Sequence, residues 1–186
     1  SRRLAEALEA CGCPADSFLE SGQLAAILGD LCQPRLGLNT AVAQRLGEMV
    51  GSVIHAARST VFSTQTDANL VRTNVDGTRH VFEFAAACEC KDWHLFSTAY
   101  VGGRCDRAEE VLLEAPPSFR NEYEWTKWTA EHETRSAAVR CGASLTTYRP
   151  SVIVGHSETG AITRFSGIYR VFRAVALLAR AAEQRG

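Results

Sequence analysis

The 186-residue sequence has no long apolar run and no excess of charge of either sign. No apolar stretch approaches the roughly 20 residues that a membrane-spanning helix needs, and the N-terminus lacks the features of a secretion signal. Lys and Arg total 20 against 21 for Asp and Glu, so the net charge of −1 gives no reason to expect nucleic acid as a partner. We expect a cytoplasmic protein with no membrane span, in which 46% hydrophobic residues form one sizeable core.

The cysteines lack the spacing of metal and redox motifs. There are seven, an odd number, and the two close pairs, Cys11/Cys13 and Cys88/Cys90, have C-x-C rather than C-x-x-C spacing. The sequence therefore predicts reduced thiols and no metal site.

Short apolar runs alternate with amphipathic stretches along the chain. Helices are expected at 2–11, 39–50, 66–90, 121–141 and 167–182, and strands at 23–28, 52–55, 94–98 and 143–149, with loops at 101–120 and 150–160. Such alternation implies parallel pairing, so we expect an α/β fold with helices on both sheet faces.

Gly77 lies inside one of the expected helices. A glycine there costs about 1 kcal/mol relative to alanine, which predicts a close packing contact or a ligand at this position.

The carboxyl ends of the expected strands carry small or polar residues. In an open α/β sheet, ligands bind outside these ends. The residues in question are Asp30, Leu31, His55, Ala56, Ala57, Ser97, Thr98, Ala99, Arg149, Pro150 and Ser151. Small side chains let a flat cofactor lie against the backbone, so this rim favours a nucleotide.

Tyr123 and Lys127, in the stretch NEYEWTK, are four residues apart and project from one face of the expected helix at 121–141. An ammonium group beside a phenol stabilises the phenolate, so the phenol can exchange a proton at physiological pH, as carbonyl–alcohol interconversion requires. Thr98 at a strand end could hold the same substrate oxygen. The alternative is a chance pair on a half-exposed helix face; the strand end about 25 residues upstream favours catalysis.

Several motifs, in order, carry a family resemblance. STAYVGG, NEYEWTK, NVDGT, VIHAA and YRPSVIVG resemble the extended short-chain dehydrogenase/reductases, over a span from Leu4 to about Tyr169. Within them, GDLCQPRLGL (29–38), STAYV and RPSVIVGHSETG (149–160) are most similar to the thioester reductase and fatty acyl-CoA reductase branch, the male-sterility-type domains.

The resemblance implies a Rossmann-type, doubly wound parallel sheet and a function in lipid-type biosynthesis. NADP, or less favoured NAD, would reduce an acyl thioester on coenzyme A or a carrier protein to an aldehyde or alcohol. The chain would act as a segment of a larger, multidomain reductase or as a homodimer.

The family's catalytic roles carry over to four positions. Thr98 would polarise the substrate carbonyl, with Ser97 the less favoured candidate. Tyr123 would donate the proton, and Lys127 would assist it and hold the nicotinamide ribose. Asn74 would support the lysine through water; without the resemblance, it could equally be a solvated helix residue.

The family's cofactor contacts carry over to further positions, in addition to Tyr123 and Lys127. Asp30 and Leu31 would flank the adenine, Ala56 and Ala57 would lie along the cofactor backbone, and Pro150, Ser151 and Val152 would lie near the nicotinamide. Alternatively, Asp30 is only a turn former and Arg149-Pro150 only ends a strand.

The sequence departs from the family at its start. It has no T-G-x-x-G-x-x-G turn, and Ser1 falls just after the family's second strand, so the first two strands are missing. We expect residues 23–28 to lack a pairing neighbour and 52–55 to form an exposed edge. Residues 1–160 would be a partial NAD(P)-binding domain and 161–186 the start of a truncated substrate-binding region, so the isolated chain would be inactive.

Two other functions remain open. A sugar-nucleotide epimerase or dehydratase shares the Thr-Tyr-Lys arrangement. A non-catalytic binding module would explain the absent phosphate loop, although packing does not need Thr98, Tyr123 and Lys127.

Overall fold

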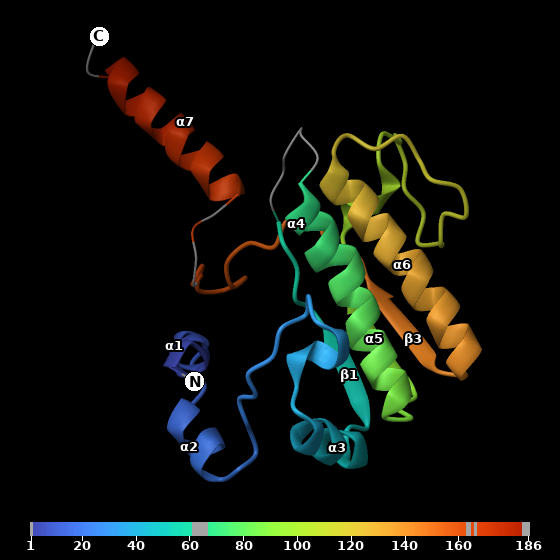
Figure 1. Ribbon diagram of the computed structural model, residues 1–186. Helices are drawn as coiled ribbons and strands as arrows, with labels where there is room; N and C mark the ends of the chain where they lie inside the picture. Colours follow the sequence, from blue (N-terminus) through green and yellow to red (C-terminus); the bar gives the residue numbers. More distant parts are fainter. Residues whose placement is uncertain (1, 61–66, 163–164, 166, 184–186) are drawn as a thin grey trace. The chain divides into compact units, whose positions relative to one another are not determined.

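The computed structural model describes residues 2–60, 67–162, 165 and 167–183 (Figure 1). The chain divides into two compact units, residues 28–151 and residues 1–27 with 152–186.

The unit 28–151 is built on a three-stranded parallel sheet in the order β1-β2-β3. The strands are β1 (Ser52–His55), β2 (Asp92–Phe96) and β3 (Ser144–Tyr148). Helices α5 (Gly77–Ala87) and α6 (Glu122–Cys141) form the crossovers between successive strands. This arrangement confirms the expected partial Rossmann-type α/β fold. It also places β1 at an edge, since its only partner among the described strands is β2.

The core of this unit lies between the sheet and the α5–α6 pair, which run side by side in Figure 1. Its fully buried members include Phe82, Trp93 and Leu95, and the Phe82 and Trp93 rings lie 4.9 Å apart. Burying each such side chain contributes about 1.5–3 kcal/mol. On the opposite sheet face, side chains are exposed within the described part of this unit: Ile54 is 68% exposed, and Tyr148 stacks on Phe96.

The helix expected at 66–90 is interrupted by a wider turn. It consists of α4 (Ala68–Val71), the π-helical turn η2 (Arg72–Asp76) and α5. A Cβ at Gly77 would lie 3.2 Å from the Leu31 Cβ, so the glycine allows a close packing contact. The prediction for this position is confirmed.

The other helix predictions in this unit follow from local signals. Helix α3 (Thr40–Met49) begins after Asn39, whose side chain accepts a hydrogen bond from the Val42 amide. Helix α6 begins after Asn121 and ends at Gly142, which has the left-handed backbone (φ 62°) that favours glycine at a helix end.

The prediction of a strand at 23–28 is wrong. These residues form no strand, and Leu28 is 96% exposed. An extended segment becomes a strand only when a neighbour supplies its hydrogen bonds, and the described sheet ends at β1. The chain instead enters the short 3₁₀ helix η1 (Pro34–Gly37).

The strand expected at 94–98 begins earlier, at Asp92. Trp93 pairs in register with Val53 and Leu145, so the sheet includes it. The 3₁₀ helix η3 (Ala99–Gly102) follows the strand.

The second unit contains α1 (Arg2–Ala10), α2 (Ala15–Glu20) and α7 (Ile168–Glu183). Helices α1 and α7 confirm the expected ones, whereas α2 is not among the helices expected from the sequence. Apolar side chains of α7 are exposed, among them Val171, Phe172 and Leu178. Within the described ranges, no helix has the length and apolar character needed to cross a membrane.

Candidate active site

Lys127 is buried on α6, with 1% of its surface exposed. Its Nζ donates a hydrogen bond of 2.9 Å to the carbonyl of Phe96, the last residue of β2. Burial, the larger cause, and the Arg58 charge together lower the pKa of Lys127 to about 8, against the opposing effect of Glu131. The ammonium is therefore held at the end of the sheet, where it can lose its proton near physiological pH.

Tyr123 lies one helical turn before Lys127 and is 3% exposed. The two side chains share one buried face of α6, whereas Trp125 is 38% exposed. The interpretation of Tyr123 and Lys127 as a half-exposed helix face is therefore wrong.

Thr98 and Ser97 follow β2 directly and are both buried. The Thr98 Oγ1 accepts a hydrogen bond of 3.3 Å from the Tyr100 amide, which leaves its hydrogen available for donation. The Ser97 Oγ is buried and has no hydrogen-bond partner among the described residues. The Ala99 amide donates to the Pro150 carbonyl at 3.0 Å, so the segments after β2 and β3 are joined at this rim.

Asn74 is buried in the π-helical turn η2. Its Oδ1 accepts from the Ser59 amide at 2.8 Å, and its Nδ2 donates to the Ser59 carbonyl at 3.1 Å and to the Thr126 Oγ1 at 3.2 Å. It is not a solvated helix residue; it connects the segment after β1 to the residue preceding Lys127. Single π-helical turns are frequent at functional sites.

His55 ends β1, and the sequence assigns it no role beyond its place on the rim. Its Nε2 lies 3.0 Å from the Thr78 Oγ1, which donates its hydrogen to the Asn74 carbonyl at 2.6 Å. The His55 Nε2 must therefore carry a hydrogen and donate it. Burial, with the nearby Lys127 charge, lowers the pKa of His55 to about 4, so the ring is neutral at physiological pH.

The residues expected to lie along the cofactor differ in their surroundings. Ala56 and Ala57 are exposed directly after β1, so no large side chain of the described ranges covers the backbone there. Pro150 is half-buried and Ser151 is exposed after β3. Val152 is exposed and belongs to the other compact unit.

Asp30 and Leu31 lie in a turn. The Asp30 Oδ1 accepts a hydrogen bond from the Cys32 amide at 2.9 Å, so Asp30 does form a turn. Leu31 packs against Gly77, and its carbonyl lies 2.8 Å from the His80 Nδ1.

Within the described part of the chain, no group of three or more His, Cys, Asp or Glu side chains could hold a metal ion. A nicotinamide ribose fits the rim better: the buried Lys127 can bond a hydroxyl, and the small side chains after β1 leave the backbone open. The chemistry that this arrangement supports is proton transfer beside a carbonyl.

These features are typical of the NAD(P)-binding fold of the short-chain dehydrogenase/reductase type. A family model described as "Male sterility protein", of the NAD-binding kind, matches residues 1–183. The chain belongs to this male sterility-type family, which confirms the resemblance found in the sequence.

Named relatives agree with this assignment. The chain is 30% identical over 173 residues to a linear gramicidin synthase protein of Brevibacillus parabrevis, covering 90% of this chain and 3% of that protein. It is 31% identical over 155 residues to isonitrile lipopeptide synthase of Streptomyces coeruleorubidus, covering 82% of this chain and 10% of that protein.

A solved structure shows the same fold. The terminal R domain from the myxalamid PKS-NRPS biosynthetic pathway aligns with a TM-score of 0.79 and 29% identity, over 92% of this chain and 43% of that one. The chain thus spans less than half of that domain and a small part of each synthase.

Proposed function

We propose that this chain is part of a reductase that reduces an acyl thioester, carried on a carrier protein or coenzyme A, to an aldehyde or alcohol. The observation that carries the proposal is the buried Lys127 ammonium at the sheet rim, one helical turn from the buried Tyr123. The similarity to carrier-based synthases and to an R domain supports a thioester as the carbonyl compound.

Each residue of the site has a role in this reaction. The Thr98 hydroxyl donates a hydrogen bond to the thioester carbonyl, and the Tyr123 hydroxyl gives its proton to the oxygen as it gains negative charge. Lys127 stabilises the resulting phenolate and binds the ribose, while Asn74 holds the adjoining turn in place. NADPH or NADH supplies the hydride when bound, and the hemithioacetal so formed releases a thiol and an aldehyde.

The cofactor positions and the domain boundaries belong to the same proposal. We place the adenine beside Asp30 and Leu31, the cofactor backbone along Ala56 and Ala57, and the nicotinamide near the segment 150–152. Residues 1–160 would be the NAD(P)-binding part and 161–186 the start of the substrate-binding region.

The proposal extends to the surroundings of the chain. A multidomain protein is favoured because the relatives are large synthases. A cytoplasmic location agrees with seven free cysteines.

The alternatives are less favoured. The sugar-nucleotide alternative has no support in the synthases and the R domain named above. A non-catalytic module does not require Lys127, because burying an ammonium group costs free energy that an apolar side chain would not.

The test uses the complete reductase domain that contains this chain, with NADPH and three compounds: an acyl thioester, a nucleotide sugar, and the thioether that lacks the thioester carbonyl. We expect NADPH oxidation and an aldehyde or alcohol product only with the thioester. The thioether is the matched control, because it keeps the carbon chain and the sulfur but offers no carbonyl. Turnover of the nucleotide sugar, with none of the thioester, would contradict the proposal.

A further inference from the structure

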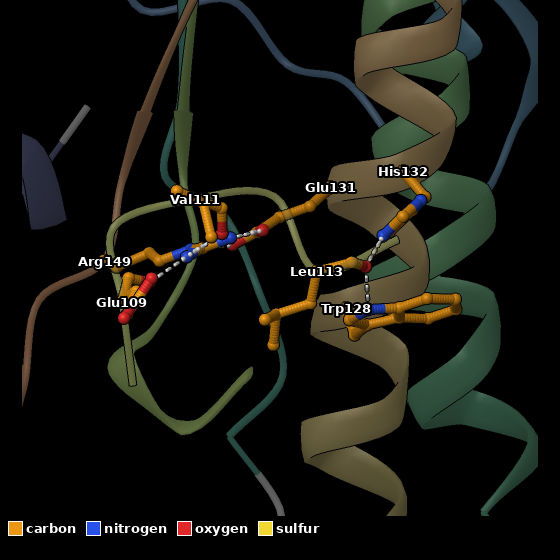
Figure 2. A network of polar contacts seen from close by, with 7 residues as sticks. All are labelled: Glu109, Val111, Leu113, Trp128, Glu131, His132 and Arg149. Carbon is orange, nitrogen blue, oxygen red and sulfur yellow. Dashed lines mark hydrogen bonds and ion pairs between the residues drawn. The ribbon is translucent and has the colours of Figure 1, made fainter. Parts of the chain in front are cut away.

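The segment that joins Thr98 to Tyr123 is held by side chains outside it (Figure 2). Arg149 Nη1 donates to the carbonyls of Glu109 at 3.3 Å and Val111 at 2.9 Å. The Leu113 carbonyl accepts from Trp128 Nε1 at 3.0 Å and from His132 Nε2 at 2.6 Å. Three alternate carbonyls of residues 109–113 are therefore fixed to α6 and to the end of β3.

Glu131 fixes the orientation of Arg149. Its Oε1 accepts from Arg149 Nε at 3.0 Å and its Oε2 from Arg149 Nη2 at 2.6 Å, a two-point contact between planar groups. The Glu131 side chain is 1% exposed and that of Arg149 19%. Because Nε and Nη2 bind the carboxylate, Nη1 is left to point at the two carbonyls, as Figure 2 shows.

This ion pair lies next to the catalytic residues on both of its elements. Arg149 stands between Tyr148 and Pro150, whose carbonyls accept hydrogen bonds from the amides of Ser97 and Ala99, the neighbours of Thr98. On α6, Glu131 lies one turn beyond Lys127 and stabilises its ammonium. The contact that holds 109–113 is thus made beside Thr98 and Lys127.

The base of the same segment is held separately. The Arg104 amide donates to the Ser118 carbonyl at 2.8 Å, and the Arg120 amide donates to Glu124 at 2.8 Å. Loss of the Arg149 contact should therefore release the middle of the segment and leave its two ends in place.

We propose that Glu131 and Arg149 are positioning residues that hold residues 109–113 against the sheet rim, where this segment forms one wall of the acyl-thioester site. The proposal rests on the proposed function for the identity of the substrate. It assigns the pair a role in substrate binding, through the segment, and no part in hydride or proton transfer.

The first experiment measures the segment without any activity assay. In the complete reductase domain, trypsin cleavage after the exposed Arg107 is followed by mass spectrometry in Arg149→Lys, which keeps the charge but loses the planar fork. We expect cleavage about tenfold faster than in the wild type, because cleavage follows the opening of the segment. Trp128→Phe, which removes one donor without changing charge, should shift cleavage the same way by less.

The matched controls come from an ion pair between α5 and α6. Glu133 pairs with Arg79 at 3.0 Å on an exposed face of α6. Arg79→Lys and Glu133→Gln should leave both cleavage after Arg107 and kinetics unchanged, since exposed pairs contribute little.

The second experiment separates positioning from general destabilisation. In Arg149→Lys, KM for the acyl thioester should rise about tenfold, while kcat and KM for NADPH stay within about twofold. In Glu131→Gln, the same rise in KM should be joined by a shift of the alkaline limb of the pH–rate profile to lower pH, because Lys127 loses a stabilising charge.

Two results would overturn the proposal: unchanged cleavage after Arg107 in Arg149→Lys, or faster cleavage with an unchanged KM for the thioester. If the wild-type domain does not turn over any acyl thioester, the proposed function fails, whereas the cleavage rates still decide whether the pair holds the segment.

Discussion

Helices α6 and α7 differ in which side chains they bury. Helix α6 buries charged and polar groups, including Glu124, Lys127 and Glu131, while α7 leaves apolar side chains such as Phe172 and Leu178 more than half exposed. An apolar stripe, as on α7, therefore indicates a helix in this chain. The candidate site lies instead on α6, whose buried face is polar.

The buried polar groups of α6 are tolerated because they have partners. Lys127 bonds the Phe96 carbonyl, Glu131 binds Arg149, and Glu124 accepts from the Arg120 amide. A buried charge without partners would be strongly destabilising. The contrast predicts that substitutions on the buried face of α6 change chemistry and those on α7 do not.

The largest effect is expected for Lys127→Met, which keeps most of the length of the side chain and removes its charge. Turnover in the complete reductase domain should fall about 10²- to 10⁴-fold, the usual range for loss of acid–base assistance. Leu178→Met, on the exposed face of α7, is the control and should have no effect on kcat. Equal turnover of the two variants, measured by NADPH oxidation, would contradict the contrast between the helices.

The two units should also differ in how much a substitution lowers the free energy of unfolding, with the larger loss in the unit 28–151. Trp93 is fully buried, so Trp93→Ala should lower the free energy of unfolding by about 3–5 kcal/mol through loss of burial and creation of a cavity. Phe172→Ala, at 55% exposed, should change it by about 0.5 kcal/mol or less. Urea unfolding followed by circular dichroism measures both; a comparable loss for Phe172→Ala would show that α7 is packed as tightly as the sheet.

Local sequence signals are sufficient for most of the fold. Asn121 and Gly142 bracket α6, and the spacing of Tyr123 and Lys127 places both on one face. Gly77 correctly indicates a close approach, although not that Leu31 is the neighbour. The apolar run at 23–28 misleads because its composition carries no information on whether a pairing strand is present.

The long-range parts of the site could not be read from sequence. Arg149 suggests only a strand end, and its contacts with Glu131 and with the carbonyls at 109 and 111 depend on how β3 packs on α6. The neutral His55 likewise results from burial and from the position of Lys127, which the VIHAA motif does not reveal.

The dependence of stability on pH should show an effect of intermediate size, through the titration of His55. Between the usual pKa of 6.5 and the folded value of about 4, unfolded His55 binds a proton that the folded state does not, so stability falls as the pH drops through this window. The loss approaches about 3 kcal/mol. His55→Gln should remove this part of the slope in unfolding experiments between pH 4 and 6.5; an unaltered slope would assign it to other groups.

The smallest effect compares two helix caps. Asn121→Ala and Asn39→Ala each remove a side-chain acceptor from the first turn of a helix, so each should cost about 1 kcal/mol in unfolding free energy. Only Asn121→Ala should also lower kcat, because Tyr123 lies in the first turn of that helix. Equal kinetics for the two variants would mean that the position of Tyr123 does not depend on its cap.

The central claim is that Tyr123 supplies the proton, and the most direct measurement is the turnover of Tyr123→Phe in the complete reductase domain. With acyl thioester as substrate, kcat should fall at least about a hundredfold while the Kd for NADPH stays within about twofold of the wild type. Retention of wild-type kcat by this variant would contradict the account.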